Sequence, residues 1–205
     1  MADAGEAIIA KLDDVAAKCF IEKGFTYRKR RNPLDPGELL DSFVPGTIHT
    51  VTGINSASVR LFALSLLWRA AVSNLPAFEL VTVRPKRLED LRQRILDDDP
   101  GAADEFPVYF AFFCGQEELP KITPFRFERH AFYRFFLDGV VCYVSPTKRP
   151  QDVARFSRFF VGRERDTFQM GCLPSSSSAL ARQAKEQLLQ LSEKHGDIFG
   201  GMRER

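Results

Sequence analysis

One long apolar segment, residues 55–75 (NSASVRLFALSLLWRAAVSNL), constrains the fold of this chain more than any other feature. Arg60 and Arg69 are its only charged residues, and a helix of this sequence shows apolar side chains on nearly every side. A helix without a polar face belongs in the centre of a domain, covered by other elements. The sequence therefore predicts a buried central helix over about 56–75.

The same segment is the one candidate for a membrane span. Four serines and two arginines interrupt it, and an arginine in the middle of a span costs about 2.5 kcal/mol or more. We therefore expect a protein without membrane contact, in which Asn55 or Ser56 caps the start of the central helix.

Further helices and an aromatic-rich sheet are predicted around the central helix. Apolar residues recur at helical spacing in 6–22 and 85–101, and the serines at 175–178 suit the cap of an amphipathic helix over 179–196. From residue 106 the pattern becomes that of strands. The strands expected are residues 106–115, a hairpin of 132–137 and 140–145 around an Asp138-Gly139 turn, and a pair within 156–173.

The order of these elements, helices first and strands later, predicts an α+β fold. The central helix should pack on a mostly antiparallel sheet over about 106–172, with the amphipathic helix at the C-terminus. A buried helix needs a broad apolar partner, so we expect one domain over residues 1–205. A mobile loop is expected over about 24–46, followed by a short strand, and a mobile tail over about 197–205.

Charge is balanced overall but uneven along the chain. The net charge of the 205 residues is only +2, so no global field demands nucleic acid or an acidic membrane. Residues 89–118 carry nine acids against two arginines, whereas residues 121–165 carry ten bases against four acids. We therefore expect one acidic and one basic surface.

No motif for catalysis or cofactor binding stands out. Glycine-rich phosphate loops and a GxSxG elbow are both missing. The four cysteines are about thirty residues apart and form no CxxC pair, which argues against a zinc ribbon. Without a signal peptide, they are expected to be reduced thiols of a cytoplasmic protein. We assign no catalytic residue, no metal and no cofactor.

Arg69 and Ser65 form one candidate ligand site. Ser58, Ser65, Arg69 and Ser73 fall on one stripe of the predicted helix. A guanidinium in a mostly buried helix needs a carboxylate or several carbonyls. The structural interpretation is an ion pair with an acid such as Asp41 or Glu117. The functional one is an arginine that lines a pocket for an anionic small molecule.

A stretch of alternating aromatic and basic residues is the candidate nucleic-acid surface. Such strands can stack bases and hold phosphates, but the same alternation arises when aromatic side chains are buried and arginines face water. A basic run, YRKRR at 27–31, is a further candidate for phosphate contact. The residues singled out are Arg28, Arg30, Arg31, Arg126, Arg134, Arg155, Arg158 and Phe159, with Arg163 and Arg165 in the same stretch.

Metal-dependent phosphodiester hydrolysis is the alternative. His49 lies in a predicted loop and could act as a ligand or base, and Asp97, Asp99 and Asp104 could hold a hard cation. Their order does not match an EF-hand loop, and the acidic run favours a solvated acidic loop over a cation site.

The central helix carries a pattern that resembles a known group of proteins. Phe62, Ser65, Trp68 and Arg69 read Phe-x-x-Ser-x-x-Trp-Arg. This resembles the body of uncharacterised bacterial HNH-endonuclease-like proteins, over about residues 10–110. The cysteine pair and histidine of their nuclease module have no counterpart here, so no catalytic residue is carried over. The resemblance implies a role beside nucleic acid in antiviral defence or a mobile element.

These observations favour a non-catalytic binding or assembly module. Its expected partners are another protein and nucleic acid, with self-association as a further option. The alternatives are the metal-dependent nuclease and the anion sensor that uses Arg69.

Overall fold

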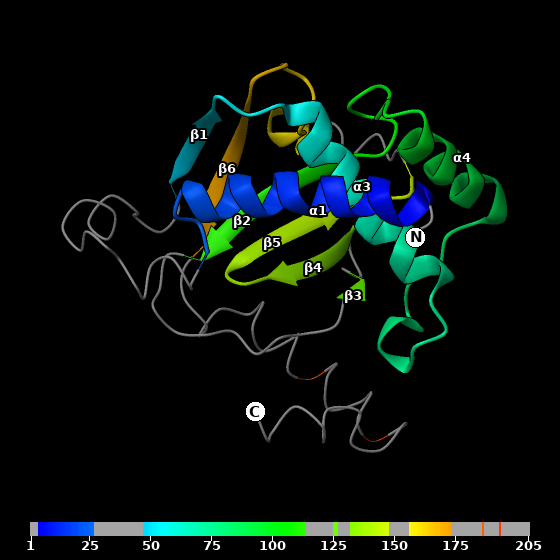
Figure 1. The fold of residues 1–205 in the computed structure, drawn as a ribbon. Helices are drawn as coiled ribbons and strands as arrows, with labels where there is room; N and C mark the ends of the chain where they lie inside the picture. Colours follow the sequence, from blue (N-terminus) through cyan, green and yellow to red (C-terminus); the bar gives the residue numbers. More distant parts are fainter. Residues whose placement is uncertain are drawn as a thin grey trace.

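The computed structural model describes residues 4–26, 47–113, 125–126, 132–147 and 156–173, together with the single positions Glu186 and Glu193. Within these described ranges, three α-helices lie against one sheet (Figure 1). They are α1 (Ala4–Glu22), α3 (Ser56–Val72) and α4 (Pro85–Leu96). Two short 3-10 helices, η1 (Pro76–Phe78) and η2 (Ser157–Phe159), lie in connecting segments. The predicted α+β class is confirmed.

The sheet has six strands in the order β1-β6-β2-β5-β4-β3. All neighbouring strands are antiparallel except β2 and β6, which are parallel. Strands β1 and β3 therefore form the two edges. The strands are β1 (Ile48–Thr52), β2 (Val108–Phe113), β3 (Phe125–Arg126), β4 (Tyr133–Leu137), β5 (Val140–Val144) and β6 (Thr167–Leu173).

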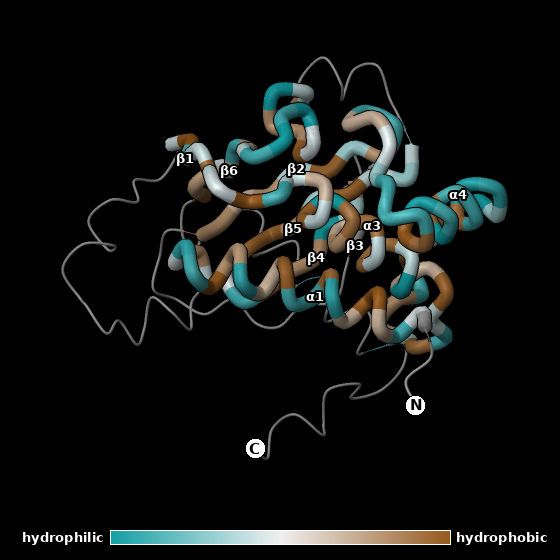
Figure 2. The backbone as a smooth tube through the Cα atoms, turned by 45° about the horizontal axis from the view of Figure 1, so that its top comes forward, coloured by the Kyte–Doolittle hydropathy of each residue, from teal (hydrophilic) through white to brown (hydrophobic). Residues whose placement is uncertain are grey.

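The sheet buries side chains on both faces because apolar residues fill both alternating sets of positions on its middle strands. Val108, Phe110 and Phe112 of β2 join the core formed with the helices. Ala111 and Phe113, the residues between and after them, join a second cluster on the opposite face. The brown strands in the interior of Figure 2, beside the largely teal α4, show the same arrangement.

Helix α3 lies at the centre, as the sequence predicts. Its start is capped by the Asn55 side chain, which accepts hydrogen bonds from the backbone N–H groups of Ala57 and Ser58 at 3.0 and 3.2 Å. Its apolar side chains pack against α1, α4 and the sheet. Trp68 is only partly buried, whereas Leu64 and Leu67 are fully buried. The side chains of α3 that the core encloses completely are therefore leucines, not the single tryptophan.

The predicted hairpin is also confirmed. Strands β4 and β5 pair with Leu137 opposite Val140, so Asp138 and Gly139 form a two-residue turn. Their φ angles are +44° and +93°, the left-handed pair that a type I′ turn requires. Glycine adopts this conformation without strain, and aspartate is among the residues that tolerate it.

The expectation of a strand pair within 156–173 is wrong. Residues 157–159 form η2, and β6 instead pairs with β1 and β2. Local alternation predicted the strand character of β6 but carried no information about its partners. Strand β1 itself confirms the short strand expected after the loop.

Several other expectations concern residues outside the described ranges. They include residues 27–46 of the predicted mobile loop, the tail over 197–205 and nearly all of the predicted C-terminal helix. At the start of that loop, Phe25 is buried and its ring lies 4.9 Å from that of Phe112. Within the described ranges, none of the helices has the length and apolar character needed to cross a bilayer.

We predict that Leu64→Ala lowers the free energy of unfolding by about 2–5 kcal/mol, because it leaves a cavity in the centre of the core. Val72→Ala, at an exposed position on the same helix, should change it by less than about 0.5 kcal/mol. Urea denaturation of both variants measures the difference. Equal effects at the two positions would contradict the central burial of α3.

Candidate functional site

A polar hollow of about 350 Å³ lies where the β1 edge of the sheet meets η2 and the loop before β6. The sheet supplies one wall. Thr50 of β1 is paired with Gln169 of β6, so their side chains leave the same face. Thr167 leaves that face as well, two residues before Gln169. The complete lining is Thr50, Arg158, Phe160, Arg163, Glu164, Thr167, Phe168 and Gln169.

Two arginines line this hollow. Arg158 comes from η2, and its guanidinium carbon lies 4.6 Å from the centroid of the Phe159 ring. Arg163 comes from the following loop and donates a hydrogen bond from Nη1 to the carbonyl of Ser157 at 3.3 Å. Both side chains are exposed. Within the described ranges, no carboxylate forms an ion pair with either one, so their charges are available to a ligand.

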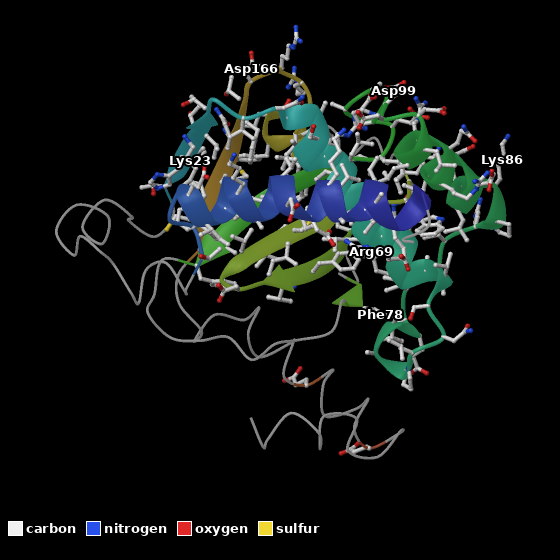
Figure 3. The ribbon with its side chains drawn as sticks, viewed as in Figure 1. Lys23, Arg69, Phe78, Lys86, Asp99 and Asp166 are labelled. Atoms are coloured by element: carbon white, nitrogen blue, oxygen red, sulfur yellow. The ribbon has the colours of Figure 1, made fainter. Side chains whose placement is uncertain are left out.

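The loop that carries Arg163 is held by the start of α3. The Ser56 hydroxyl donates to the carbonyls of Glu164 and Arg165, and the Ser56 backbone N–H donates to the Arg165 carbonyl at 3.0 Å. The Gly53 N–H donates to the carbonyl of Asp166 at 3.1 Å. Figure 3 shows Asp166 at the outer end of β6, in this loop. The rim of the hollow is therefore fixed by hydrogen bonds to its backbone.

Arg60 supports the same region from inside. Its guanidinium is fully buried and donates to the carbonyl of Gly101 at 2.6 Å and to that of Ala102. Burial lowers the pKa of Arg60 to about 10, so it keeps its charge at neutral pH. Gly162 lies against this side chain, because a Cβ there would sit 3.1 Å from Arg60 Cδ. With a φ of +91°, Gly162 lets the chain pass close to Arg60 without strain.

The structure places one of the predicted nucleic-acid residues in the lining of the hollow and a second next to it in the chain. Arg158 lines it, and Phe159 is the next residue along the chain. Arg126 lies on β3, at the opposite edge of the sheet. Arg28, Arg30, Arg31 and Arg155 lie outside the described residues.

Arg134 is a correction, because it does not reach the surface. Its side chain is 1% exposed and lies on the sheet face opposite the helices, with its guanidinium carbon 5.6 Å from the Tyr143 ring centroid. Tyr143 in turn stacks on Tyr109, with centroids 4.3 Å apart. Burial lowers the pKa of Arg134 and raises that of Tyr143. A phosphate in solution cannot contact a side chain so placed.

Arg69 and Ser65 are both engaged within the fold. Arg69 forms a bidentate pair with Asp13 of α1, with N–O distances of 3.0 and 2.8 Å. Figure 3 shows Arg69 beside α1. Ser65 is buried and donates to the carbonyl of Phe62 at 2.7 Å. The two acids named as partners lie outside the described residues, and the pair with Asp13 removes the reason for placing an anionic ligand at Arg69.

The residues of the metal-dependent alternative are not brought together. His49 lies on β1, accompanied by the Thr47 hydroxyl at 2.9 Å and the Phe112 ring at 5.3 Å. Asp99 lies beyond α4, where it pairs with Arg94 (Figure 3). Asp97 and Asp104 belong to the same acidic region after α4. Within the described part of the chain, no three histidine, cysteine or acidic side chains gather as metal ligands would.

The cysteines differ from expectation in one case. Cys19 and Cys142 are free and buried, and burial raises the pKa of both thiols, that of Cys19 to about 12. Cys172 is disulfide-bonded, so the expectation of four reduced thiols is wrong for this residue.

Comparison with known proteins identifies no relative. The chain matches no protein-family model, no curated protein and no solved structure at a significant level. The resemblance to HNH-endonuclease-like proteins therefore stays a prediction.

Sequence reasoning missed most of the hollow. Thr50, Thr167 and Gln169 are ordinary strand residues whose grouping depends on the pairing of β1 with β6. Ser56 was considered only as a helix cap, although its hydroxyl holds the loop. A hydroxyl three residues before a buried Val-Arg pair gives no signal of a partner more than a hundred residues away.

We predict that the stability of the protein depends on the protonation of His49. Burial lowers its pKa below the ordinary 6.5, so the unfolded chain binds the proton first as the pH falls. The neutral His49 side chain therefore contributes to folding stability above about pH 6.5, and this contribution is lost as the pH falls below that value. The free energy of unfolding should therefore fall more steeply from roughly pH 7 to 5 in the wild type than in His49→Gln. Parallel curves for the two proteins would refute this.

We further predict that Ser56→Ala lowers the free energy of unfolding by about 1–3 kcal/mol, because two loop carbonyls lose their hydroxyl donor. Ser58→Ala on the same helical turn is the matched control and should cost less than about 0.5 kcal/mol. Thermal unfolding of the two variants measures the difference. Equal midpoint temperatures would show that the Ser56 hydroxyl does not hold the loop.

Proposed function

We propose that the protein is a non-catalytic binding module whose hollow at β1, β6 and η2 holds phosphate groups of single-stranded nucleic acid. The observation that carries the proposal is the pair Arg158 and Arg163, which line one polar hollow without a carboxylate partner in the described ranges. Guanidinium groups bind phosphate through paired, charge-assisted hydrogen bonds. Thr50, Thr167 and Gln169 add neutral donors on the wall behind them.

The arginines of the helical layer provide the contrast. Arg69 binds Asp13, Arg92 binds Glu89 and Arg94 binds both Asp99 and Glu105. Arg60 is enclosed by backbone carbonyls. Charges that are already neutralised or enclosed offer less to a ligand than the exposed guanidinium groups of Arg158 and Arg163 do.

Nucleic acid is favoured over a small inorganic anion by the aromatic residue next to the hollow. Phe159 is partly exposed and lies beside the Arg158 guanidinium. A base stacked on an aromatic side chain next to an arginine is the usual arrangement in single-strand binding. The hollow also lies beside β1, the strand at one edge of the sheet (Figure 1).

Binding explains this lining better than catalysis does. It consists of two arginines, two threonines, a glutamine, one carboxylate and two phenylalanines. Arginine, hydroxyl and amide groups position a phosphate, whereas hydrolysis needs an activated nucleophile or a metal site. The partner protein and the defence context that the resemblance implies form no part of this proposal.

We predict that the double variant Arg158→Ala/Arg163→Ala binds a labelled single-stranded 15-mer at least about tenfold more weakly at low salt. Each lost phosphate contact removes about 0.7 from the slope of log K against log salt, so the slope should fall by about 1.4. Arg92→Ala, which removes an exposed arginine of α4, is the matched control. Fluorescence anisotropy at several salt concentrations measures both, and an unchanged slope in the double variant would refute the proposal.

A further inference from the structure

We infer that the same hollow selects nucleotides by their base, with Glu164 as the residue that reads hydrogen-bond donors and guanine as the preferred base. The inference rests on the proposed nucleic-acid function and adds base selectivity to it. Its starting point is the one acidic residue of the lining, Glu164, which stands beside Arg158 and Arg163.

Glu164 is not neutralised by the arginines around it. Its side chain is exposed, and no described residue forms an ion pair with its carboxylate. Its backbone carbonyl is held by the Ser56 hydroxyl, which fixes the position of the residue at the rim. The hollow therefore presents an acceptor carboxylate on a held backbone, together with two guanidinium donors, to the same ligand.

A carboxylate is unfavourable in a site that holds only phosphate, because two negative charges then lie close together. It becomes favourable when the ligand also carries N–H donors. Nucleotides meet this condition, with a negative phosphate at one end and a base edge at the other. The hollow of about 350 Å³ lies at the small end of the range of ligand pockets, roughly 300–1,000 Å³, which suits one nucleotide unit.

The bases can then be ranked by the hydrogen-bond donors that each offers to the Glu164 carboxylate. An ionised carboxylate only accepts hydrogen bonds and has two oxygens. Guanine offers it two adjacent donors, N1–H and the N2 amino group, and so forms two parallel charge-assisted bonds. Adenine and cytosine offer one amino group beside a ring nitrogen that accepts. Uracil and thymine offer one N–H between two carbonyl oxygens, which the carboxylate repels.

The rest of the lining is consistent with a bound base. Phe160 is the phenylalanine on this side of the sheet, since the Phe168 side chain points into the core with the helices, and Gln169 supplies an amide that can both donate and accept. A base has apolar faces and a polar edge, and base recognition in single strands reads that edge.

The test compares single-stranded RNA 9-mers that differ at the central position only. The probes are U9 and the same strand with one central guanosine, inosine or adenosine. One guanosine in a uridine background avoids self-association. Wild-type protein should bind the guanosine strand about tenfold more tightly than U9, with inosine in between because it lacks the N2 amino group.

Glu164→Gln isolates the carboxylate, since it keeps the size of the side chain and the backbone carbonyl that Ser56 holds. The guanosine preference should fall below about threefold, and U9 should bind more tightly because the repulsion of its phosphates is gone. Glu6→Gln on α1 is the control and should retain the preference. Thermal unfolding of each variant confirms that the fold is intact.

The outcomes separate the two proposals. A wild-type protein that binds all four strands equally, or a guanosine preference that survives in Glu164→Gln, overturns the inference but leaves phosphate binding in place. Failure to bind any strand at low salt overturns the proposed function and the inference with it.

Discussion

Burial of most of α3 takes several of its polar side chains out of water, and the rest of this structure depends on how those groups are paired. Ser56, Arg60 and Arg69 each bind a carbonyl or a carboxylate of another element, and an unsatisfied buried donor would cost about 1–3 kcal/mol. Arg69 binds Asp13 and so fixes α1. Arg60 binds the carbonyls of residues 101 and 102 and so fixes the segment between α4 and β2. Ser56 binds the loop before β6.

The few polar side chains of α3 thus form hydrogen bonds and an ion pair with the neighbouring elements, while its many apolar side chains pack against them. This division explains why three segments far apart in the sequence converge on one helix. The two arginines are not equivalent in this respect. Arg60 is fully buried and uses carbonyls, whereas Arg69 is partly exposed and uses a carboxylate. Desolvation of a full ion pair is costly in a dry interior, so neutral acceptors suit the deeper position.

The sequence predicted what depends on local periodicity. The central helix, the Asp138-Gly139 hairpin and the aromatic strand β2 all follow from spacing and turn chemistry. It did not predict contacts that depend on distant pairing. The hollow requires β1 to pair with β6, and the carboxylate bound by Arg69 proved to be Asp13 of α1. Neither contact leaves a trace in the spacing of nearby residues.

Arg134 and Arg158 show that one sequence pattern can lead to two different environments. Both belong to stretches in which basic and aromatic residues alternate, and both were candidates for phosphate contact. Alternation indicates that the side chains of a strand divide between the two faces of the sheet. It does not indicate which of those faces other parts of the protein cover. Arg134 lies in an inner strand of a sheet buried on both faces, against Tyr143. Arg158 lies in η2 beside the β1 edge of the sheet and stays exposed.

The hydrogen bonds from α3 to the rim also bear on how the hollow would bind a ligand. A flexible loop loses conformational freedom when a ligand orders it, and that loss weakens binding. Here the carbonyls of residues 164–166 are already held by Ser56 and Gly53, and Gly162 is seated against Arg60. The backbone that carries Arg163 and Glu164 is therefore ordered before a ligand arrives. What remains to be ordered is the exposed ends of the side chains, so the packing of α3 sets the position of the rim from which those side chains reach the hollow.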